Sequence, residues 1–394
     1  MLCKRCLFSS NICKITENQC EYCDIHDMLE KTNIDFNPVL SKIQEVDNKY
    51  NCIMGISGGK DSTTLLYMAV KVWNLRPLVI HFDNHWNTPI AEENMKNLIQ
   101  RLNVDLIRFN VNKEEYDNLN KAFLMAGVPD ADIPNDIAMT KLMYQTAEQF
   151  NIKYILNGHC FRTEGSTPKL WTYMDSKYIS DIYKKFYNKE LQNFPLFTFT
   201  DQLHYSKLNI QQVRPFHYKN VNREKYDEIV KKELGWRSYG WKHGENKYTD
   251  FVGSYLLPRK FGIDKRIVYL SAQVRSCVID KDDAWDVLNI EPDYDTSLIG
   301  KEYLSLIEGP VNSRDLYDKY DFKKAKWLIY YLYVTRAVPY TFYIKYSEKV
   351  KYDYHNLDDF TESDLQEFKQ ILIDEKYDDE ELEKIRKGVI ENLS

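Results

Sequence analysis

An apolar segment runs directly into a glycine turn at residues 53–62, which read IMGISGGKDS, and a helical pattern follows at once. Because Gly58 and Gly59 lack a Cβ, the backbone can turn sharply there and point successive N–H groups at an anion on the positive N-terminus of the helix. Lys60 adds a positive charge for a phosphate group, and Asp61 is a suitable ligand for Mg²⁺. The segment therefore predicts a phosphate-binding loop between a buried strand and a helix.

The spacing within this loop excludes two common nucleotide sites. It fits neither the Walker A loop, with four residues between Gly and Gly-Lys, nor the dinucleotide pattern GxGxxG. The string SGGKDS instead resembles the PP-loop of N-type ATP pyrophosphatases, which split ATP into AMP and pyrophosphate; a glycine-rich turn without nucleotide chemistry is the alternative. The resemblance implies ATP with Mg²⁺, and we assign to the nucleotide Gly55, Ser57, Gly58, Gly59, Lys60, Asp61, Ser62, Phe82, Asp83 and Gly158.

Strand and helix patterns alternate through the first half of the chain. This alternation predicts an α/β fold, a doubly wound parallel sheet of the PP-loop (adenine nucleotide alpha hydrolase-like) type, covered on both faces, with ligands at the carboxyl ends of the strands. We expect strands at Tyr50–Ile56, Pro77–Phe82, Asp105–Val111 and Ile152–Leu156, and helices at Asp61–Trp73, Ala91–Leu102, Asn135–Phe150 and Arg223–Leu234.

Two CxxC pairs near the N-terminus, Cys3 with Cys6 and Cys20 with Cys23, indicate a structural zinc site. Each pair brings two thiolates to one side of a tight turn, and two turns complete a tetrahedral S₄ site. Cys13 or His26 remains a possible replacement for one of these thiolates. Disulfides and a redox role are the weaker interpretations.

Composition limits the partners. The 394-residue chain is 43% hydrophobic and carries 53 Lys and Arg against 59 Asp and Glu, so its net charge of -6 gives no global reason to bind nucleic acid. The segment from Met1 to Cys23 has no apolar core of a signal peptide, and the apolar segment Trp327–Tyr346 contains Arg336 and Pro339. We therefore expect a cytoplasmic protein without a membrane span.

Three further strings are more specific: GHCFRTEG at 158–165, KHGENKYTDF at 242–251 and LPRKFGIDKR at 257–266. With the CxxC pairs and SGGKDS, in this order, they resemble the N-acetyl sugar amidotransferase family of bacterial surface-polysaccharide (lipopolysaccharide) and flagellin-glycan synthesis, over about Cys3 to Pro292. The resemblance implies that ATP adenylates the acetamido oxygen of an N-acetylated sugar and that ammonia replaces it, giving an acetamidino sugar, AMP and pyrophosphate. The chain departs from the family pattern at Cys160, at Gly244 and Asn246, and at 273–276.

The resemblance also implies roles for the charged residues of these strings. The glycine turn at 158 allows its neighbours to approach the sugar or AMP, and a His-x-Glu pair in extended chain places both side chains on one face, where they orient ammonia or accept its proton. A pair held in the scaffold, and a solvated cationic turn, are the alternatives. We predict catalytic roles for Lys60, Asp61, His159, Arg162, Glu164, His243 and Glu245, and substrate binding by Arg259, Lys260, Lys265 and Arg266.

Family members receive ammonia from a separate glutaminase subunit, and we expect the same partner here. Residue 2 is Leu, so removal of Met1 exposes no nucleophilic cysteine. Cys52, Cys160 and Cys277 stand singly, and an inert packing role is expected for all three. The main rival is a PP-loop tRNA thiolase, which also adenylates a carbonyl but uses further cysteines near its loop. A noncatalytic zinc-scaffolded partner is the second rival.

We divide the chain into four parts: a zinc-binding module at 1–30, the PP-loop domain at 45–160, a substrate-binding part of the same catalytic unit at 161–310, and a mainly helical extension at 311–394. In the extension, Ser363 and Gln366 predict a helix start and Asp378–Glu391 a second short helix.

Overall fold

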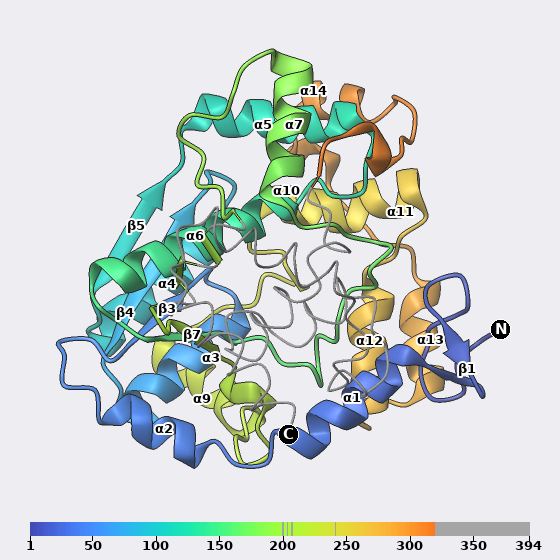
Figure 1. The fold of residues 1–394 in the computed structure, drawn as a ribbon. Helices are drawn as coiled ribbons and strands as arrows, with labels where there is room; N and C mark the ends of the chain where they lie inside the picture. The colour runs from blue at the N-terminus through green and yellow to red at the C-terminus, as the bar shows by residue number, and fades with distance from the viewer. Residues whose placement is uncertain (199–200, 203, 206–207, 241, 320–394) are drawn as a thin grey trace, which may run out of the picture.

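The computed structural model describes residues 1–319 except 199–200, 203, 206–207 and 241 (Figure 1). Its centre is a five-stranded sheet in the order β5-β4-β3-β6-β7, in which every neighbouring pair is parallel. The predicted α/β fold with a parallel sheet is confirmed. The strands are β3 (Cys52–Gly55), β4 (Pro77–Asp83), β5 (Leu106–Asn110), β6 (Tyr154–Leu156) and β7 (Gln211–Val213).

Helices cover both faces of this sheet, which explains why its central strands are apolar at nearly every position. Ile53 and Ile80 point into one core, which holds residues of α5 (Lys113–Ala126), α6 (Ile133–Gln149) and α7 (Ser176–Tyr187). Their neighbours Met54 and Val79 point into the other core, with α3 (Lys60–Tyr67), α4 (Pro89–Leu102) and α9 (Glu224–Leu234). Because successive side chains of a strand point to opposite faces of the sheet, the central strands contribute apolar side chains to both cores.

Most predicted elements begin and end within about two residues of the observed ones. The helix expected at Asp61–Trp73 is α3 continued by a π-helical turn, Met68–Val72. Several observed elements were not predicted, and two of them, α5 and β7, belong to the sheet and its covering layer. Helix α5 has a clear N-cap at Asn112 and a left-handed end at Gly127, whereas β7 is only three residues long and reads Gln-Gln-Val.

A smaller group of helices extends beyond the sheet (Figure 1). It contains α10 (Lys247–Asp250), the π-helical Phe251–Leu256, α11 (Leu257–Phe261), α12 (Arg266–Arg275), α13 (Lys281–Asn289) and α14 (Lys301–Leu306). Short 3₁₀ turns occupy Pro215–His217, Thr296–Leu298 and Arg314–Leu316.

The start of the N-terminal segment packs against this group of helices, whose residues lie far from it in the sequence. The hairpin of β1 (Ile15–Thr16) and β2 (Gln19–Cys20) makes this contact, whereas α1 (Glu21–Thr32) leads away from it and α2 (Asn37–Gln44) lies near α3 (Figure 1), where Ile43 joins a core of the sheet. The hairpin lies beside α12 and α13 (Figure 1). The Leu7 amide donates to the Ser271 hydroxyl at 3.3 Å, and Lys281 Nζ donates to the Cys3 carbonyl at 2.8 Å.

The helices of the described residues are all too short or too polar to cross a membrane. The helices predicted near Ser363 and at Asp378–Glu391, and the segment Trp327–Tyr346, lie outside the described residues.

Candidate active site

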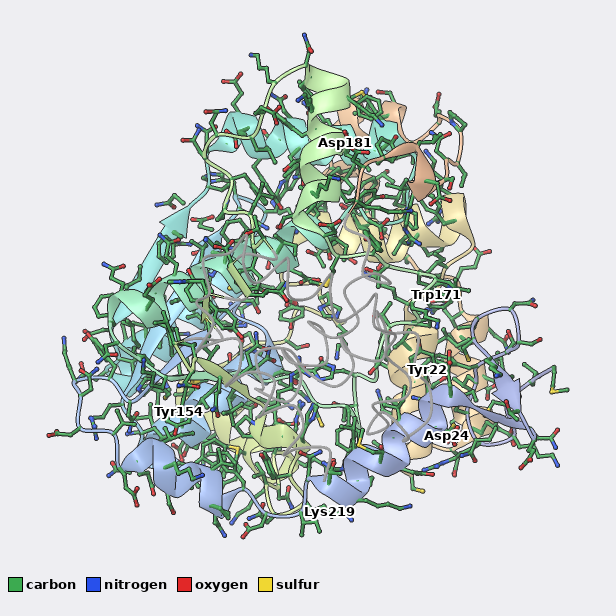
Figure 2. All side chains as sticks on the ribbon, viewed as in Figure 1. Tyr22, Asp24, Tyr154, Trp171, Asp181 and Lys219 are labelled. Atoms are coloured by element: carbon green, nitrogen blue, oxygen red, sulfur yellow. The ribbon has the colours of Figure 1, made fainter. Side chains whose placement is uncertain are left out.

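A cavity of about 740 Å³ lies at the carboxyl edge of the sheet. Ser57 follows β3, Asn84 follows β4 and Asn157 follows β6, and all three line it. Part of the opposite wall comes from 242–246 of the KHGEN string, and Tyr22 on α1, labelled in Figure 2, lines it as well. The strand ends thus place Ser57 of the glycine loop and residues of the downstream strings around one cavity, whereas residues 58–62 are not among those that line it.

The glycine loop has the geometry of an anion cradle. Gly58 adopts φ +76, and a Cβ there would lie 2.4 Å from the Ala91 carbonyl oxygen, so only glycine fits. Helix α3 begins at Lys60 with Gly59 as its N-cap, which leaves the first N–H groups of the helix for a ligand. Ser57 and Ser62 lie on the loop, and their hydroxyls lie within 3.5 Å of loop backbone atoms.

Helix α9 holds the two charged residues that open α3. Lys60 Nζ pairs with Asp227 Oδ2 at 2.9 Å, and Arg223 donates to Asp61 Oδ1. Neither predicted partner, a phosphate for Lys60 or a metal ion for Asp61, is therefore needed to keep these side chains in place. Both charges remain close enough to the loop to exchange partners when a nucleotide binds.

Asp61 also takes part in a half-buried carboxyl pair with Glu164. Burial and the adjacent Asp61 charge raise the pKa of Glu164 to about 8, despite Lys242, whose Nζ lies 3.5 Å from Glu164 Oε1. Burial acts to raise the pKa of Asp61 too, but the hydrogen bond from Glu164 and the charges of Arg223 and Lys242 lower it. Near neutral pH the pair therefore holds one proton, on Glu164.

His159 lines the cavity, but both of its ring nitrogens already have partners. Nε2 donates to the Gly165 carbonyl at 3.0 Å, so Nδ1 accepts from His217 Nε2 at 3.2 Å. Burial and the charge of Arg214 lower the pKa of His159 to about 3. This ring is a neutral positioning group at the turn after β6, and the predicted catalytic role of His159 beside the sugar or AMP stays a prediction.

Arg162 does not line the cavity. Its guanidinium donates to Glu30 on α1, at 2.5 and 3.0 Å, and to the carbonyls of Phe216 and His217. A guanidinium with all of these acceptors ties α1 to the turn after β7, so we replace the predicted contact with sugar or AMP by this structural role.

Glu245 connects the downstream string to the glycine loop. Its Oε1 accepts from the Ser57 hydroxyl at 3.4 Å, its Oε2 is buried without a hydrogen-bond partner, and burial raises its pKa. His243 keeps solvent access within the recess and has φ +67; enclosure by the protein and the charges of Lys242 and Lys265 lower its pKa to about 3. A neutral imidazole and a basic carboxylate thus flank the loop.

The predicted basic cluster is divided. Lys265 lines the cavity, but Arg266 binds Asp264 and the carbonyls at the end of α13. Arg259 donates to the Ser254 carbonyl and lies over the Tyr255 ring, and neither it nor Lys260 reaches the cavity. Of the four residues, only Lys265 is placed to meet a ligand there.

Residues after β4 form a second polar group. Phe82 lines the cavity, and Asp83 pairs with Arg108 at 2.9 Å. His81, Asp83 and Glu92 lie within 4.8 Å of one another, but Arg108 also binds Glu92, so a guanidinium already neutralises these carboxylates.

Sequence reasoning missed several polar residues of the wall. Asn246 donates to the Asn84 side chain at 2.9 Å and so fixes the KHGEN string against the end of β4. Arg214 follows the unpredicted strand β7 and lines the cavity. The segment before Pro215 offers only Ile210 and Val213 around two glutamines, a pattern too short and too polar to predict a strand.

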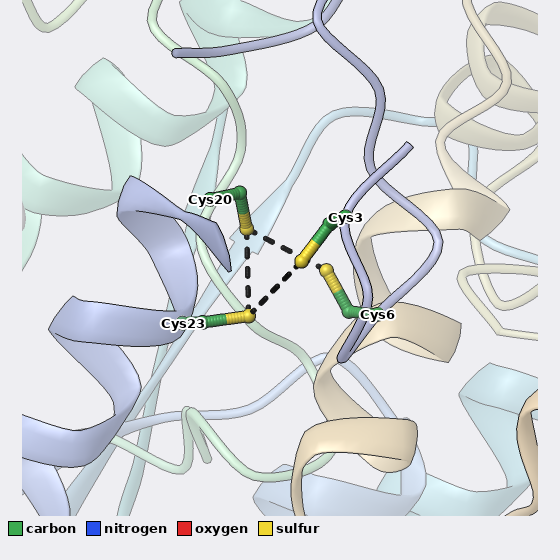
Figure 3. A group of neighbouring side chains, drawn as sticks. All are labelled: Cys3, Cys6, Cys20 and Cys23. Atoms are coloured by element: carbon green, nitrogen blue, oxygen red, sulfur yellow. Dashed lines mark hydrogen bonds between the residues drawn. The ribbon is translucent and has the colours of Figure 1, made fainter. Parts of the chain in front are cut away.

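The four cysteines of the two CxxC pairs converge near the surface of α12 (Figure 3). All four are fully buried, and sulfur atoms lie 3.5–3.7 Å apart in the pairs Cys3–Cys23, Cys6–Cys20 and Cys20–Cys23. Tetrahedral Zn–S bonds of about 2.3 Å require sulfurs about 3.8 Å apart, so the group fits a metal ion. Arg275 donates to Cys6 at 3.4 Å and offsets thiolate charge. Cys13 and His26 lie outside this group.

The single cysteines are placed differently from one another. Cys52 and Cys160 are buried, as expected for packing, whereas Cys277 is exposed in the turn after α12, so a packing role for it is wrong. None of the described cysteines lines the cavity.

Two segments of the chain match known protein families. Residues 51–219 match the phosphoadenosine phosphosulfate reductase domain, and residues 245–328 match the C-terminal domain of the lipopolysaccharide biosynthesis protein WbpG-like family. A segment similar to the reductase domain is thus followed along the chain by a segment similar to the WbpG-like C-terminal domain. The second match begins at Glu245, the residue that contacts the loop.

Three individual proteins are similar over part of their length. An uncharacterized protein of Methanocaldococcus jannaschii is 27% identical over 130 residues, which span 33% of this chain and only 46% of that protein. The U34-tRNA thiolase NcsA of Methanococcus maripaludis, solved with its 4Fe-4S cluster, is 10% identical with a TM-score of 0.30, over 73% of this chain and 87% of that one. NMN synthetase of Francisella tularensis is 13% identical with a TM-score of 0.27, over 59% and 92%.

Proposed function

We propose that the protein is an ATP-dependent amidotransferase that converts an acetamido group of a sugar into an acetamidino group. The observation that carries this proposal is the contact between Glu245, at the start of the WbpG-like domain, and Ser57 of the glycine loop. It links the predicted nucleotide loop to the WbpG-like segment, and both Ser57 and Glu245 line a cavity of about 740 Å³, large enough for a small ligand.

The chemistry requires activation of an inert group. An amide carbon has no good leaving group, so its oxygen attacks the α-phosphorus of ATP, pyrophosphate leaves, and the oxygen becomes part of an adenylate. Ammonia then adds to the same carbon, and AMP leaves with the original amide oxygen. Loop N–H groups, the serine hydroxyls and Lys60 stabilise the charge that develops on pyrophosphate.

Three side chains suit this chemistry: Glu245 serves the ammonia step, and Glu164 and Lys242 act beside the triphosphate. Ammonia must lose protons as it adds, and the buried Glu245 carboxylate, whose pKa burial raises, accepts one of them. Glu164, protonated near neutral pH, donates a hydrogen bond to the carboxylate of Asp61 and so limits the negative charge next to the triphosphate. Lys242, near both carboxylates, acts in the same direction.

Metal ions enter this proposal in two places. The charge and position of Asp61 beside the loop suit Mg²⁺ once Arg223 shares the carboxylate, and the ion would supply charge neutralisation to the triphosphate. The four buried thiols would hold Zn²⁺ as a structural centre. We also propose that a separate glutaminase subunit supplies the ammonia and that the protein acts in the cytoplasm.

An isotope experiment tests the reaction. The purified chain is incubated with ATP, Mg²⁺, ammonium and acetamido sugars labelled with ¹⁸O in the acetamido group, and sugar and AMP are measured by mass spectrometry. We expect replacement of O by NH in the sugar and transfer of ¹⁸O to AMP. A parallel reaction with tRNA and a sulfur donor tests the thiolase alternative: thiolated tRNA, with no acetamidino product, would reject the amidotransferase.

A further inference from the structure

Arg214 differs from every other arginine that the structure describes. The remaining eleven each donate a side-chain hydrogen bond to a carboxylate, a carbonyl or a thiol, as Arg223 does to Asp61 and Arg275 does to Cys6. Arg214 has no ion pair or side-chain hydrogen bond among the described residues, and its Nε is buried without a partner. A guanidinium in this state lacks the acceptors that buried charges normally have.

The surroundings of Arg214 point to a ligand as the missing acceptor. Burial lowers the pKa of Arg214 to about 10, an effect that Glu164 and Tyr144 only partly oppose, so the group is still charged near neutral pH. The residue lines the cavity beside Gln212 and Tyr144. The cavity beside these side chains has room for an oxygen atom of a ligand.

The sheet topology separates this position from the glycine loop. Arg214 directly follows β7, and β7 is two places from β3 in the strand order. Neighbouring strands lie about 4.8 Å apart, so the two strand ends are separated by roughly 10 Å. The triphosphate bound at the loop is therefore not the natural partner of this guanidinium.

We propose that Arg214 forms an anion subsite on the acceptor side of the cavity and binds a carboxylate or phosphate oxygen of the acceptor sugar. This inference rests on the proposed function for the identity of the acceptor. It assigns to Arg214 the role that the sequence suggested for residues 259–266, of which only Lys265 reaches the cavity. The planar guanidinium suits such oxyanions because it donates two parallel hydrogen bonds.

Binding without turnover tests the subsite. Calorimetry on the full chain, in the absence of ATP, compares an N-acetylhexosamine, the matching uronic acid and the matching 1-phosphate. We expect one acidic sugar to bind about tenfold or more tightly than the neutral one. In Arg214→Met this preference disappears while affinity for the neutral sugar is unchanged, and the acidic sugar that loses affinity identifies the anion as carboxylate or phosphate.

Two controls keep the result specific. Arg214→Lys retains a charge without the planar fork and should keep part of the preference, and it replaces Arg214→Met if the latter does not fold. Arg237→Met removes an exposed arginine, paired with Glu93, and should change nothing. ATP affinity, measured separately, should be the same in all variants.

The subsite is rejected if the wild-type chain binds neither acidic sugar more tightly than the neutral one, if Arg214→Met keeps the preference, or if the variant loses ATP binding instead. These outcomes do not depend on product formation. Failure of the proposed function appears separately, as the absence of acetamidino product from sugars that bind through Arg214.

Discussion

The ammonium group of Lys60 lies 2.9 Å from the carboxylate of Asp227, although Lys60 is the cation of the phosphate loop. The same carboxylate accepts from Thr64, so α9 competes with a nucleotide for the first turn of α3. Under the proposed function, Lys60 has to leave this ion pair to reach a phosphate of ATP.

Asp227→Asn should therefore strengthen ATP binding. Lys60 is 42% exposed, and a pair at this exposure contributes about 0.2–1 kcal/mol, so the dissociation constant for ATP should fall by up to about fivefold. Calorimetry with ATP and Mg²⁺ measures the change. The matched control is Glu233→Gln, which changes another carboxylate of α9, the one that accepts a hydrogen bond from Tyr67. Weaker ATP binding in Asp227→Asn would show that the carboxylate supports the site.

Gly58→Ala should disable the loop. The added Cβ meets the Ala91 carbonyl at 2.4 Å on a backbone with φ +76, which costs about 1–3 kcal/mol or displaces the loop. We expect a lower melting temperature and loss of pyrophosphate release. Gly253→Ala is the control, because its Cβ meets no atom within 4 Å. Equal melting temperatures and activities in the two variants would contradict the described loop geometry.

Glu245→Gln keeps the shape of the side chain but removes the proton acceptor. The loss of one general base typically costs about 10²–10⁴-fold in rate. Ammonia-dependent product formation should fall by this factor, while ATP binding stays intact. Because burial raises the pKa of Glu245, the variant should unfold at the same or a higher temperature near neutral pH. Unchanged turnover would remove Glu245 from the mechanism.

Glu164→Gln should change how stability depends on pH. The pKa of Glu164 is about 8 in the folded chain and about 4.5 for an unperturbed glutamate, so between these values the folded chain binds more protons than the unfolded one. Its contribution is fully present below about 4.5 and is lost as the pH rises to about 8. Melting temperatures across this range should fall less in Glu164→Gln than in the wild type; parallel curves would exclude a protonated Glu164.

Cys20→Ser should remove the bound metal, since the remaining thiols cannot complete the S₄ group. Mass spectrometry of metals should find about one zinc per chain in the wild type and much less in the variant, which should also melt earlier. Cys277→Ser, an exposed cysteine, is the control and should retain the metal. A visible absorption spectrum with iron in place of zinc would reject the zinc assignment while leaving the site itself intact.

The sequence predicts those parts of the fold whose geometry depends on residues close together in the chain. The glycine loop is readable because its geometry depends on Gly58 and Gly59, and the four cysteines because their spacing suits one ion. The partners of long side chains are not readable in this way. Arg162 binds Glu30, 132 residues away, and nothing near Arg162 in the sequence distinguishes this pair from a ligand contact.

The same reason explains why Arg214 was missed. Arg214 stands out because it has no hydrogen-bond partner among the described residues. That isolation depends on the position of Arg214 at the end of β7, so it can be recognised only in the folded sheet. His159 is the converse case: its position after β6 was expected, but the His217 ring that occupies its second nitrogen comes from a segment 58 residues later.

The docking of the cysteine hairpin on α12 has a consequence for biosynthesis. Leu7 and Ser271 are 264 residues apart, and ribosomes add about 5–20 residues per second, so the first residues to emerge wait roughly 13–50 s for the surface that buries them. During that interval the four thiols are open to oxidation, and the apolar side chains of Leu7 and Phe8 are open to chaperones. We therefore expect metal loading to be a late, nearly post-translational event, and yields in heterologous expression to depend on zinc supply and on reducing conditions.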